Sequence, residues 1–571
     1  MKNLLKYVRP YYKAMLIGFL IKVTATNFEL ALPWVLSYMI DSIIPTKSIK
    51  MILVFGGLML AFTLGAAILN MSANRRASKV ARDATERIRN DLFRKVTYLS
   101  NGQIDKATLP SIISRLTTDT YNVHSLIGVG QRLGVRAPIM FVGGIIITLT
   151  LDPVLTLVML SMLPLIVFLV IKVHKKAIPM YREFQKKIDR FVQVVREDCA
   201  GIRVIKALSK TEFEKQKFNA INENVVKQEQ KAGMTMGILN PAMNLLLNFG
   251  MAIVILAGAY RVNSGLTSPG KIIAFLSYVV LILNAILFIS RMFVIYSKAE
   301  ASANRISEIL NTQEELLVEE IPSVNSEYHI EFNDVSFAYE EVDNTLQNIS
   351  FSLKRGETLG IIGATGAGKT AIINLLIRFY DVDEGAILIN GNNIKSLKTK
   401  ELREKFGVVF QNDILFNDSI YENIKIGREL DREQILRAVD YARAKEFIDD
   451  KENGVEGTVN IKGANLSGGQ KQRVLIARAL AGKPEILILD DSSSALDYKT
   501  DSALRSEIRN HFQETTTILI AQRISSIRYA NQILVLEQGR IVGIGRHEEL
   551  LENCSIYLEI YRSQMGGCEN E

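Results

Sequence analysis

The sequence has few cysteines, and they are far apart. The 571 residues include three, Cys199, Cys554 and Cys568, without the close spacing of a metal site. We therefore expect reduced thiols of the cytosolic side rather than a disulfide framework. The basic N-terminus also lacks a compact apolar core followed by a small-residue cleavage site. The first apolar segment is expected to stay in the protein rather than to be removed as a signal peptide.

The sequence also lacks an acidic balance, because its formal net charge at pH 7 is +8. Basic charge of this size fits either nucleic acid or basic loops beside anionic lipid. The hydrophobic residues, 48% of the chain, are concentrated in the first half, which favours a membrane protein without a nucleic-acid partner. The length is too great for one hydrophobic core, so we expect at least two domains.

Six apolar segments fill the first half of the chain. Each is long enough to cross a hydrocarbon layer of about 30 Å as an α-helix. They cover 13–43, 51–73, 132–150, 153–174, 235–261 and 270–296. Lys and Arg are concentrated in the connections 74–125 and 175–232. This concentration of positive charge predicts that these connections and both termini lie in the cytoplasm, with the spans in the cell membrane (plasma or inner).

The two long basic connections keep apolar residues at helical spacing among their charges. We expect each pair of spans to continue as a helical hairpin, with tips near 101–110 and 206–213. Such tips lie roughly 40 Å beyond the membrane at the rise of an α-helix. Two matched extensions ahead of a soluble domain indicate a coupling role, and simple solvated helices are the alternative.

Charged residues inside apolar segments are costly and face a bundle interior or a wet cavity. Lys22 and Glu29 lie seven residues apart in the first segment, hence on one helix face, and Arg136 begins the third. Either Lys22 and Glu29 pair with each other, or Glu29 lines a substrate cavity and meets a cationic substrate. The sequence leaves both open.

The pattern changes after residue 312. Residues 313–327 are acidic and contain Ile-Pro-Ser, which indicates a linker. From 328 to 571 short β-rich runs alternate with helical stretches, as in an α/β domain. The expected fold is therefore multi-domain: an all-α domain of six transmembrane helices with long cytoplasmic extensions, 1–312, fused to an α/β P-loop ATPase domain, 328–571.

A phosphate-binding loop is the strongest motif. It follows a predicted strand, precedes a predicted helix, and satisfies G-x-x-x-x-G-K-[ST]. Its glycines let successive amides point at phosphates, next to the positive end of a helix. Lys369 is expected to reach the outer phosphates of ATP, and the Thr370 hydroxyl to bind Mg²⁺. The ATP-binding residues of the loop are Gly363, Thr365, Gly366, Ala367, Gly368, Lys369 and Thr370.

Two further motifs follow in the sequence. A buried-strand run, 486–489, ends at Asp490, which is placed to hold Mg²⁺, and Asp491 takes the position that polarises the attacking water. Ser467, with Gln470 three residues later, predicts a capping box that presents free amides at a helix start.

The motif L-S-G-G-Q, lying between the phosphate loop and the Asp490 strand, resembles the signature of the ATP-binding cassette superfamily. Six spans with two long hairpins resemble one half of a type IV exporter, and the resemblance covers essentially the whole chain. It implies that two such chains dimerise, each ATP lying between one chain's phosphate loop and the other's signature. The resemblance gives roles to the following residues: Tyr339 stacks on adenine; Gln411 contacts Mg²⁺; Leu466, Ser467, Gly468, Gly469 and Gln470 are the signature acting in trans; Ser494, Ala495, Leu496 and Asp497 are the D-loop.

Three positions depart from the family pattern. Where the family has its catalytic glutamate, this chain has Asp491. Gln522 takes the place of the switch histidine, and Ile461 takes the place of a glutamate before the signature. A carboxylate misplaced by about 1 Å can cost on the order of a hundredfold in rate. Glutamine can donate a hydrogen bond to a γ-phosphate but cannot become cationic, and His547 lies too far downstream to be an obvious substitute.

These departures predict a degenerate ATP site of low activity. The preferred hypothesis is a heterodimeric exporter whose second half-transporter carries the glutamate and histidine and an altered signature. The resemblance implies a hydrophobic or amphipathic substrate, drug-like or lipid-like. A homodimeric exporter with a slow Asp-based ATPase, or an ATP-gated regulatory membrane protein, is the alternative. An importer is disfavoured because spans and ATPase are fused in one chain without a receptor-docking segment. A peptide exporter stays open as an alternative, although no protease-like domain precedes the first span.

Overall fold

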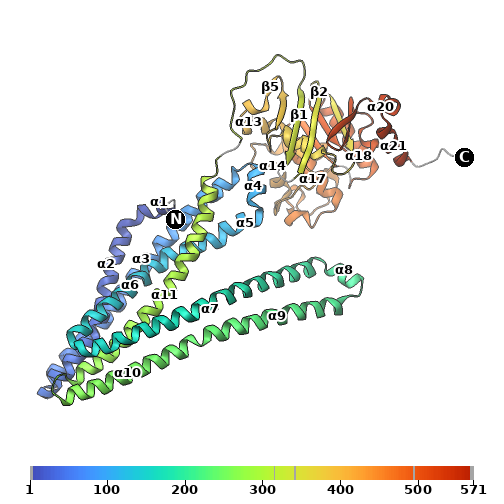
Figure 1. Cartoon of the computed structure of the whole chain (residues 1–571). Helices are drawn as coiled ribbons and strands as arrows, with labels where there is room; N and C mark the ends of the chain where they lie inside the picture. The colour runs from blue at the N-terminus through green and yellow to red at the C-terminus, as the bar shows by residue number, and fades with distance from the viewer. Residues whose placement is uncertain (1–3, 314–315, 340–341, 493–494, 566–571) are drawn as a thin grey trace. The chain divides into compact units, whose positions relative to one another are not determined.

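The computed structural model describes residues 4–313, 316–339, 342–492 and 495–565. Within it the chain divides into two compact units (Figure 1). The first unit comprises Met1–Thr97 and Pro110–Thr312, and the second comprises Tyr98–Leu109 and Gln313–Glu571. A short segment from the first half of the sequence therefore packs with the second unit.

The first unit is made up of helices, in which long helices are joined by short ones. They are α1 (Leu5–Val8), α2 (Tyr12–Tyr38), α3 (Ile49–Thr97), α5 (Leu109–Ser114), α6 (Thr120–Leu151), α7 (Pro153–Ala200), α8 (Ile202–Ala207), α9 (Thr211–Gly237), α10 (Leu239–Asn263) and α11 (Pro269–Asn311). Among the described residues, six helical stretches are long and apolar enough to cross a membrane. The six predicted spans are confirmed.

The second and fourth spans continue unbroken into the charged connections, as the helical spacing predicted. Helix α3 is 49 residues long and α7 is 48. Figure 1 shows α7 and α9 running alongside each other toward α8, and the Gln228 amide of α9 donates to the Met180 carbonyl of α7 at 3.2 Å. This pair is the second of the predicted helical hairpins.

A short helix lies at or beside each predicted hairpin tip, a detail that was not predicted from the sequence. The second tip is α8, and the first is α4 (Asn101–Ala107), which belongs to the second unit. Ser100 caps α4 reciprocally: its hydroxyl accepts from the Gln103 N–H at 3.2 Å, and its own N–H donates to the Gln103 side chain at 3.1 Å. The S-x-x-Q spacing noted at the signature is repeated here and is the signal that was missed.

A charged network joins three helices of the first unit. Glu29 of α2 accepts from Arg136 of α6 at 2.8 Å and from Asn70 of α3 at 2.7 Å. Lys22 is buried and donates to Asn70 at 2.6 Å and to Asn74 at 3.3 Å. Glu29 therefore takes its cationic partner from α6, while Lys22 reaches it only through the shared amide of Asn70.

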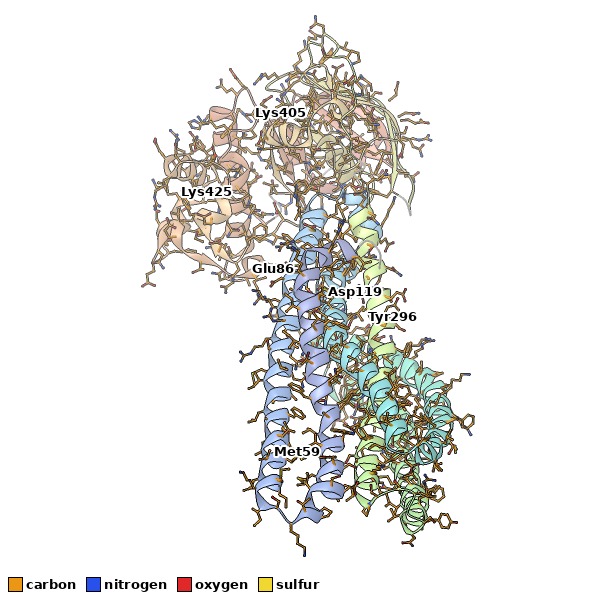
Figure 2. The ribbon with its side chains drawn as sticks, turned by 90° about the vertical axis from the view of Figure 1, so that its left-hand side faces the viewer. Met59, Glu86, Asp119, Tyr296, Lys405 and Lys425 are labelled. Carbon is orange, nitrogen blue, oxygen red and sulfur yellow. The ribbon has the colours of Figure 1, made fainter. Side chains whose placement is uncertain are left out.

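A buried carboxylate just before α6 joins this helix to α11. Asp119 ends a π-helical turn, Arg115–Asp119, just before α6. Its side chain is 1% exposed and accepts from Ser302 and from Arg305 Nε, both at 2.8 Å. Figure 2 labels Asp119 between α3, which carries Glu86, and α11, which carries Tyr296. Arg305 Nη2 also donates to Asp119, at 2.5 Å. A buried charge with three donors is well compensated, so this contact fixes the two helices against each other.

The second unit is built on two sheets. A six-stranded sheet has the order β12 (Arg540–Gly545), β11 (Gln532–Glu537), β3 (Thr358–Gly363), β10 (Thr516–Ile520), β9 (Ile486–Asp490), β6 (Phe406–Val409). A four-stranded sheet has the order β2 (Val342–Leu353), β1 (Ile330–Tyr339), β4 (Glu384–Ile389), β5 (Asn392–Asn393). All pairings in the first sheet are parallel except β11 with β12. The expected α/β fold is confirmed.

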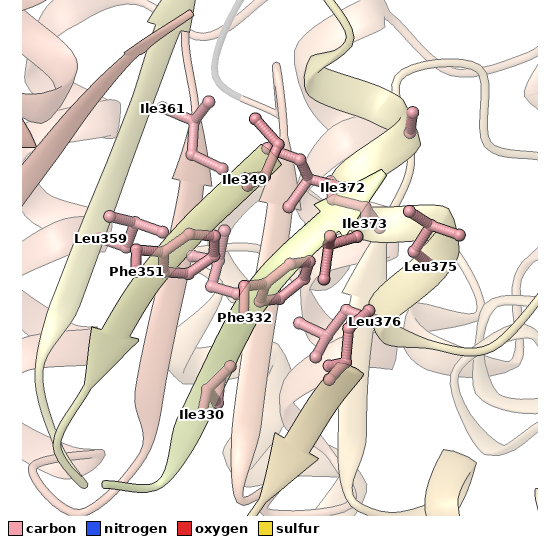
Figure 3. Close-up of a cluster of buried hydrophobic side chains, with 14 of the residues drawn as sticks. Ile330, Phe332, Ile349, Phe351, Leu359, Ile361, Ile372, Ile373, Leu375 and Leu376 are labelled. Atoms are coloured by element: carbon pink, nitrogen blue, oxygen red, sulfur yellow. The ribbon is translucent and has the colours of Figure 1, made fainter. Parts of the chain in front are cut away.

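The main core lies between the antiparallel sheet, the parallel sheet and α12 (Lys369–Leu376) (Figure 3). Phe332 of β1 faces Phe351 of β2 in register, with ring centroids 4.5 Å apart. Ile372 and Ile373 of α12 are fully buried against them. This packing fixes the start of α12, and with it the end of the phosphate loop.

A second core belongs to a helical part of the same unit. Its elements are α14 (Ile420–Lys425), α15 (Arg432–Tyr441), α16 (Lys445–Asp449), α17 (Gly468–Leu480), α18 (Tyr498–His511) and the β7 (Asp418–Ser419) and β8 (Thr458–Val459) pair. The remaining helices are α13 (Thr399–Glu404), α19 (Ile524–Ile527), α20 (His547–Asn553) and α21 (Ser555–Met565). The signature helix α17 packs in this second core, and α12 packs in the first.

Candidate functional site: a nucleotide-binding site

The phosphate loop joins β3 to α12. Gly366 and Gly368 have φ of 86° and 100°, a left-handed region that glycine enters without strain. A Cβ at Gly363 would lie 2.2 Å from the Leu536 carbonyl oxygen, so the close passage of β11 also requires glycine. The backbone shape that the motif predicted is therefore forced by its own glycines and by the neighbouring strand.

Lys369 folds over the loop it belongs to. Its ammonium donates to the carbonyls of Gly363 at 2.7 Å and Ala364 at 2.8 Å. Burial lowers the pKa of Lys369, and the carboxylates of Asp490 and Asp491 oppose that shift. These two carbonyl bonds hold the ammonium at the mouth of the loop, where a phosphate oxygen is a stronger acceptor.

The end of β9 places Asp490 beside the start of α12. Asp490 is 3% exposed, and its carboxylate accepts from the Thr370 hydroxyl at 3.4 Å. Burial raises the pKa of Asp490 to about 6, and the neighbouring Asp491 charge adds to the rise. A buried carboxylate with one neutral partner is an incomplete charge arrangement, which a cation completes.

Asp490 and Thr370, two of the Mg²⁺ ligands predicted from the sequence, lie together and fit this ion. Mg²⁺ is commonly held by one or two protein oxygens, with phosphate oxygens and water completing the shell. In the described part of the chain, no three His, Cys, Asp or Glu side chains gather into a metal site of their own. Asp490 and Thr370 thus suit an ion that arrives with a nucleotide. The third predicted ligand, Gln411, is exposed just beyond the end of β6.

Asp491 and Gln522 lie together at the other end of the site. The Gln522 amide donates to the Asp491 carboxylate at 3.1 Å, and the Asp491 N–H donates to the Ile520 carbonyl at 3.0 Å. Asp491 has φ of 47°, a left-handed conformation that Asp adopts more readily than most side chains. Burial raises the pKa of Asp491 against the lowering effect of Arg523 and Lys369.

His547 does not take part in this arrangement. It is 7% exposed at the start of α20, and its Nδ1 lies 2.8 Å from the Tyr557 hydroxyl. Burial lowers the pKa of His547, so the ring is neutral near pH 7. The histidine serves the packing of the C-terminal helices, in agreement with the expectation that it does not replace a switch histidine.

Tyr339 ends β1, half-buried at the edge of the main core. Its hydroxyl accepts from the Asn374 amide at 3.0 Å, and its ring meets the Tyr380 ring edge to face with centroids 5.1 Å apart. Tyr380 in turn donates its hydroxyl to Asp105 of α4 at 2.5 Å. Two tyrosines therefore connect the predicted adenine position with the first hairpin tip, inside one compact unit. The sequence reasoning missed Tyr380, Asn374 and Asp105, which belong to no short motif.

The signature loop begins α17. The Ser467 hydroxyl accepts from the Gln470 N–H at 3.2 Å, and the Ser467 N–H donates to the Gln470 side chain at 3.0 Å, which confirms the predicted capping box. A Cβ at Gly469 would lie 3.1 Å from the Ala495 carbonyl oxygen, and one at Gly468 would lie 3.3 Å from Ala495 Cβ. The glycines therefore let the D-loop lie directly on the signature.

The D-loop leads into α18. Leu496 is buried, and Asp497 caps α18 by accepting from the Thr500 N–H at 2.9 Å and its hydroxyl at 2.7 Å. These bonds hold the pKa of Asp497 below its usual value. Ser494, the first predicted D-loop residue, lies outside the described residues.

Comparison with known proteins supports both halves of the chain. Residues 15–286 match the family described as ABC transporter transmembrane region, and residues 346–494 match the family described as ABC transporter. The chain is 33% identical over 568 residues to YfiB of Bacillus subtilis (strain 168), named an uncharacterized ABC transporter ATP-binding protein, with 99% of each covered. It is 30% identical over 567 residues to YknU of the same organism, also named an uncharacterized ABC transporter ATP-binding protein, with 99% of this chain and 97% of that one covered.

A solved structure shares the fold. The structure of a bacterial Atm1-family ABC exporter with ATP bound matches with a TM-score of 0.83 and 24% identity, covering 97% of this chain and all of that one. At this identity the likeness establishes the exporter fold alone. The full-length relatives and the two family matches show that this chain belongs to the ABC transporter family, as a multi-pass membrane protein with an exporter fold and its ATP-binding domain in the same polypeptide.

Proposed function

We propose that this chain is the degenerate-site subunit of a heterodimeric ABC exporter. Its phosphate loop and Asp490 bind Mg²⁺ and ATP, while hydrolysis runs mainly at a second site built by a partner half-transporter. Binding of ATP at both sites brings the two ATPase domains together and drives alternating access of the membrane helices. Hydrolysis at the partner's site resets them.

The hydrogen bond between Gln522 and Asp491 carries this proposal. At the catalytic position Asp491 supplies a short carboxylate. At the switch position Gln522 supplies a neutral amide, which donates to that carboxylate at 3.1 Å. Asp491 reaches one methylene less than glutamate, and Gln522 cannot supply a positive charge to a developing phosphate charge. The site keeps its groups for holding phosphate and has weaker groups for cleaving it.

The signature is the part that this chain gives to its partner. Ser467 and Gln470 complete their capping box, so the remaining N–H groups at the start of α17 are directed out of the helix. Backbone donors at a helix start suit the γ-phosphate of an ATP held by another chain. The proposed dimer would therefore have one sound composite site and one that retains ATP.

Several finer assignments belong to the same proposal. We place both termini in the cytoplasm and the spans in the cell membrane, with domain boundaries at 1–312, 313–327 and 328–571. The transported compound is hydrophobic or amphipathic, drug-like or lipid-like, in keeping with an exporter-type fold. Glu29 is a residue of the substrate cavity in this proposal, although its charge is already balanced by Arg136. Because of that pairing, the proposed role of Glu29 is to line the cavity and position the helices around it rather than to bind a cation directly.

A matched pair of variants in the two composite sites tests the proposal. The full-length protein is purified from its native membranes together with any chain that accompanies it, and ATPase rates are compared. Asp491→Asn acts on this chain's own site, and Ser467→Ala acts on the site completed by its signature. Ser419 caps α14 by accepting from the Glu422 N–H at 3.0 Å, so Ser419→Ala controls for the loss of a helix cap.

We expect the purified assembly to contain two different chains, and the two variants to lower its ATPase rate by unequal factors. Ser467→Ala should lower the ATPase rate about tenfold or more, whereas Asp491→Asn should change it less than about twofold. Two identical chains, with Asp491→Asn abolishing the rate, would overturn the heterodimer and leave the slow homodimeric exporter. Normal ATP turnover without movement of any tested amphipathic compound into vesicles would favour a regulatory membrane protein instead.

A further inference from the structure

The segment that carries Gln522 is held by the last helix of the described chain. The Gln564 side chain of α21 donates through Nε2 to the Gln522 carbonyl at 2.6 Å. Its Oε1 accepts from the Ile524 N–H at 2.8 Å. One amide side chain thus engages both backbone groups that flank Arg523, in the way that a neighbouring strand would.

The two bonds satisfy groups that have no partner within their own element. Ile524 is the first residue of α19, and Arg523 before it is extended (φ −107°, ψ 129°) and gives no side-chain cap. The N–H groups of a helix's first turn need partners from outside the helix. Gln564 therefore caps the start of α19 through the Ile524 N–H. At the same time it fixes the backbone of Gln522 through the Gln522 carbonyl.

Helix α21 is anchored well enough to act as a fixed support. Tyr557 is fully buried and hydrogen-bonded to His547, and Ile560 and Tyr561 pack against the same cluster, which also contains Ile524 and Ile527. Gln564 lies seven residues after Tyr557, two helical turns along the same face. Its side chain is thereby directed toward the Gln522 segment by packing rather than by chance.

Little side-chain packing restrains Gln522, although the buried Ala521 before it donates its N–H to the Ile361 carbonyl of β3 at 3.2 Å. The side chains of Gln522 and Arg523 are exposed, and a cavity of about 440 Å³ lies between Asp491, Gln522, Tyr561 and Gln564. Because this space is open, packing contributes little to holding the Gln522 backbone if the Gln564 bonds are lost. Gln522 is the donor to Asp491, so a shift of its backbone moves that donor directly.

A second tether holds α19, the short helix that follows the Gln522 segment. Arg505 of α18 donates to the carbonyls of Ser525 and Ser526 while it is paired with Asp501. Helix α18 therefore holds α19, while the C-terminal helix holds the backbone on either side of Arg523. Of these two tethers, the Gln564 side is the one that acts on Gln522 itself.

We propose that Gln564 is a positioning residue of the ATP site, which makes the C-terminal helix α21 part of the nucleotide machinery. It sets where the Gln522 amide is presented, and so how long a bound ATP is retained. This inference rests on the proposed role of Gln522 at the γ-phosphate. It does not depend on which of the two composite sites hydrolyses ATP.

The test is a double-mutant cycle on nucleotide retention in the purified full-length assembly. Release of a radiolabelled, slowly hydrolysed ATP analogue is timed for Gln564→Met, which keeps side-chain length but removes both bonds, and for Gln564→Glu, which removes only the donor. Each is measured alone and with Gln522→Ala. Ser563→Ala, an exposed neighbour on α21, is the matched control. The apparent melting temperature is recorded for every variant.

Gln564→Met should speed release about fivefold, the effect of a net hydrogen-bond loss of ordinary size, and Gln564→Glu should do so by a similar or smaller factor. In the Gln522→Ala background the same changes should have less than about a twofold effect, with Ser563→Ala silent in both. Equal effects in both backgrounds, or no effect at all, would overturn the inference. If Gln564→Met fails to fold, the Gln564→Glu cycle decides by the same criterion.

The number of release phases separates this result from the proposed heterodimer. Two phases, of which only one responds to Gln564, indicate two unlike sites. A single phase that responds as a whole indicates two identical chains. In either case the cycle with Gln522 shows whether Gln564 acts through the Gln522 amide.

Discussion

The two ends of the nucleotide site are built in different ways. At the phosphate end, Gly363, Lys369 and Thr370 are fixed by a fully packed core and by a neighbouring strand that admits only glycine. At the hydrolytic end, the side chains of Asp491 and Gln522 are joined to each other by one hydrogen bond beside an open cavity. The first end tolerates almost no change of shape, while the second can be altered by one or two side chains. Loss of hydrolytic groups with retention of phosphate-binding groups is therefore the easier way for such a site to change.

The largest effect should come from the phosphate end. Lys369→Ala removes the ammonium that lies on the Gly363 and Ala364 carbonyls and is expected to face the outer phosphates. ATP affinity at this site should fall about a hundredfold, because a charge-assisted contact to phosphate is lost in a partly buried place. Nucleotide binding to the purified protein measures the change. Lys400→Ala, a well-exposed lysine on α13, should leave affinity unaltered. Equal losses for both lysines would contradict the comparison.

An intermediate effect is expected where the two ends meet, at Asp490. Burial raises the pKa of Asp490 to about 6, so the ionised carboxylate is the disfavoured form without nucleotide. Ionising this carboxyl lowers the stability of the folded protein. The loss of stability is absent below the ordinary pKa of about 3.9 and complete above about pH 6. Asp490→Asn should therefore stabilise the nucleotide-free protein by on the order of 2 kcal/mol at pH 8 and by nothing at pH 4.

The same substitution should weaken Mg²⁺-dependent ATP binding at pH 8, because the charge that holds the ion is gone. Melting temperatures of the full-length protein at several pH values, with and without Mg²⁺ and ATP, measure both effects. A variant that is less stable than the parent at pH 8 without nucleotide would show that the Asp490 charge is already well compensated by Thr370 and Lys369.

The smallest effect should come from rebuilding the hydrolytic end. Asp491→Glu with Gln522→His restores a longer carboxylate and a side chain that can become cationic, and should raise ATP turnover at this site about tenfold. Asp491→Glu alone should do less, since glutamate enters the left-handed conformation at this position less readily than aspartate. ATPase assays on the single and double variants check the order. If the double variant is no faster than the parent, residues other than this pair limit the rate.

Much of this arrangement was predictable from the sequence, for reasons that differ between its parts. The six spans and the phosphate loop are encoded locally, by long apolar runs and by a glycine pattern that permits one backbone shape. The Ser467–Gln470 capping box was found by its spacing and is present as expected. The matching Ser100–Gln103 box was overlooked only because no motif surrounded it.

Contacts between distant residues were beyond such reasoning. Glu29 finds its cation on α6, 107 residues away, and not on its own helix. Tyr380 and Asp105 are 275 residues apart, and Gln564 and Gln522 are 42 apart in elements that no short pattern connects. Hydrogen-bond partners of this kind are selected by tertiary packing, which a single sequence does not display.

The unbroken length of α3 has a mechanical consequence. At the rise of an α-helix, its 49 residues extend about 70 Å. A rod of that length, turned about one end by only about five degrees, carries its other end through about 6 Å, roughly the height of one helical turn. Small rearrangements among α2, α3 and α6 are thereby converted into large excursions at the far end, without any hinge along the rod.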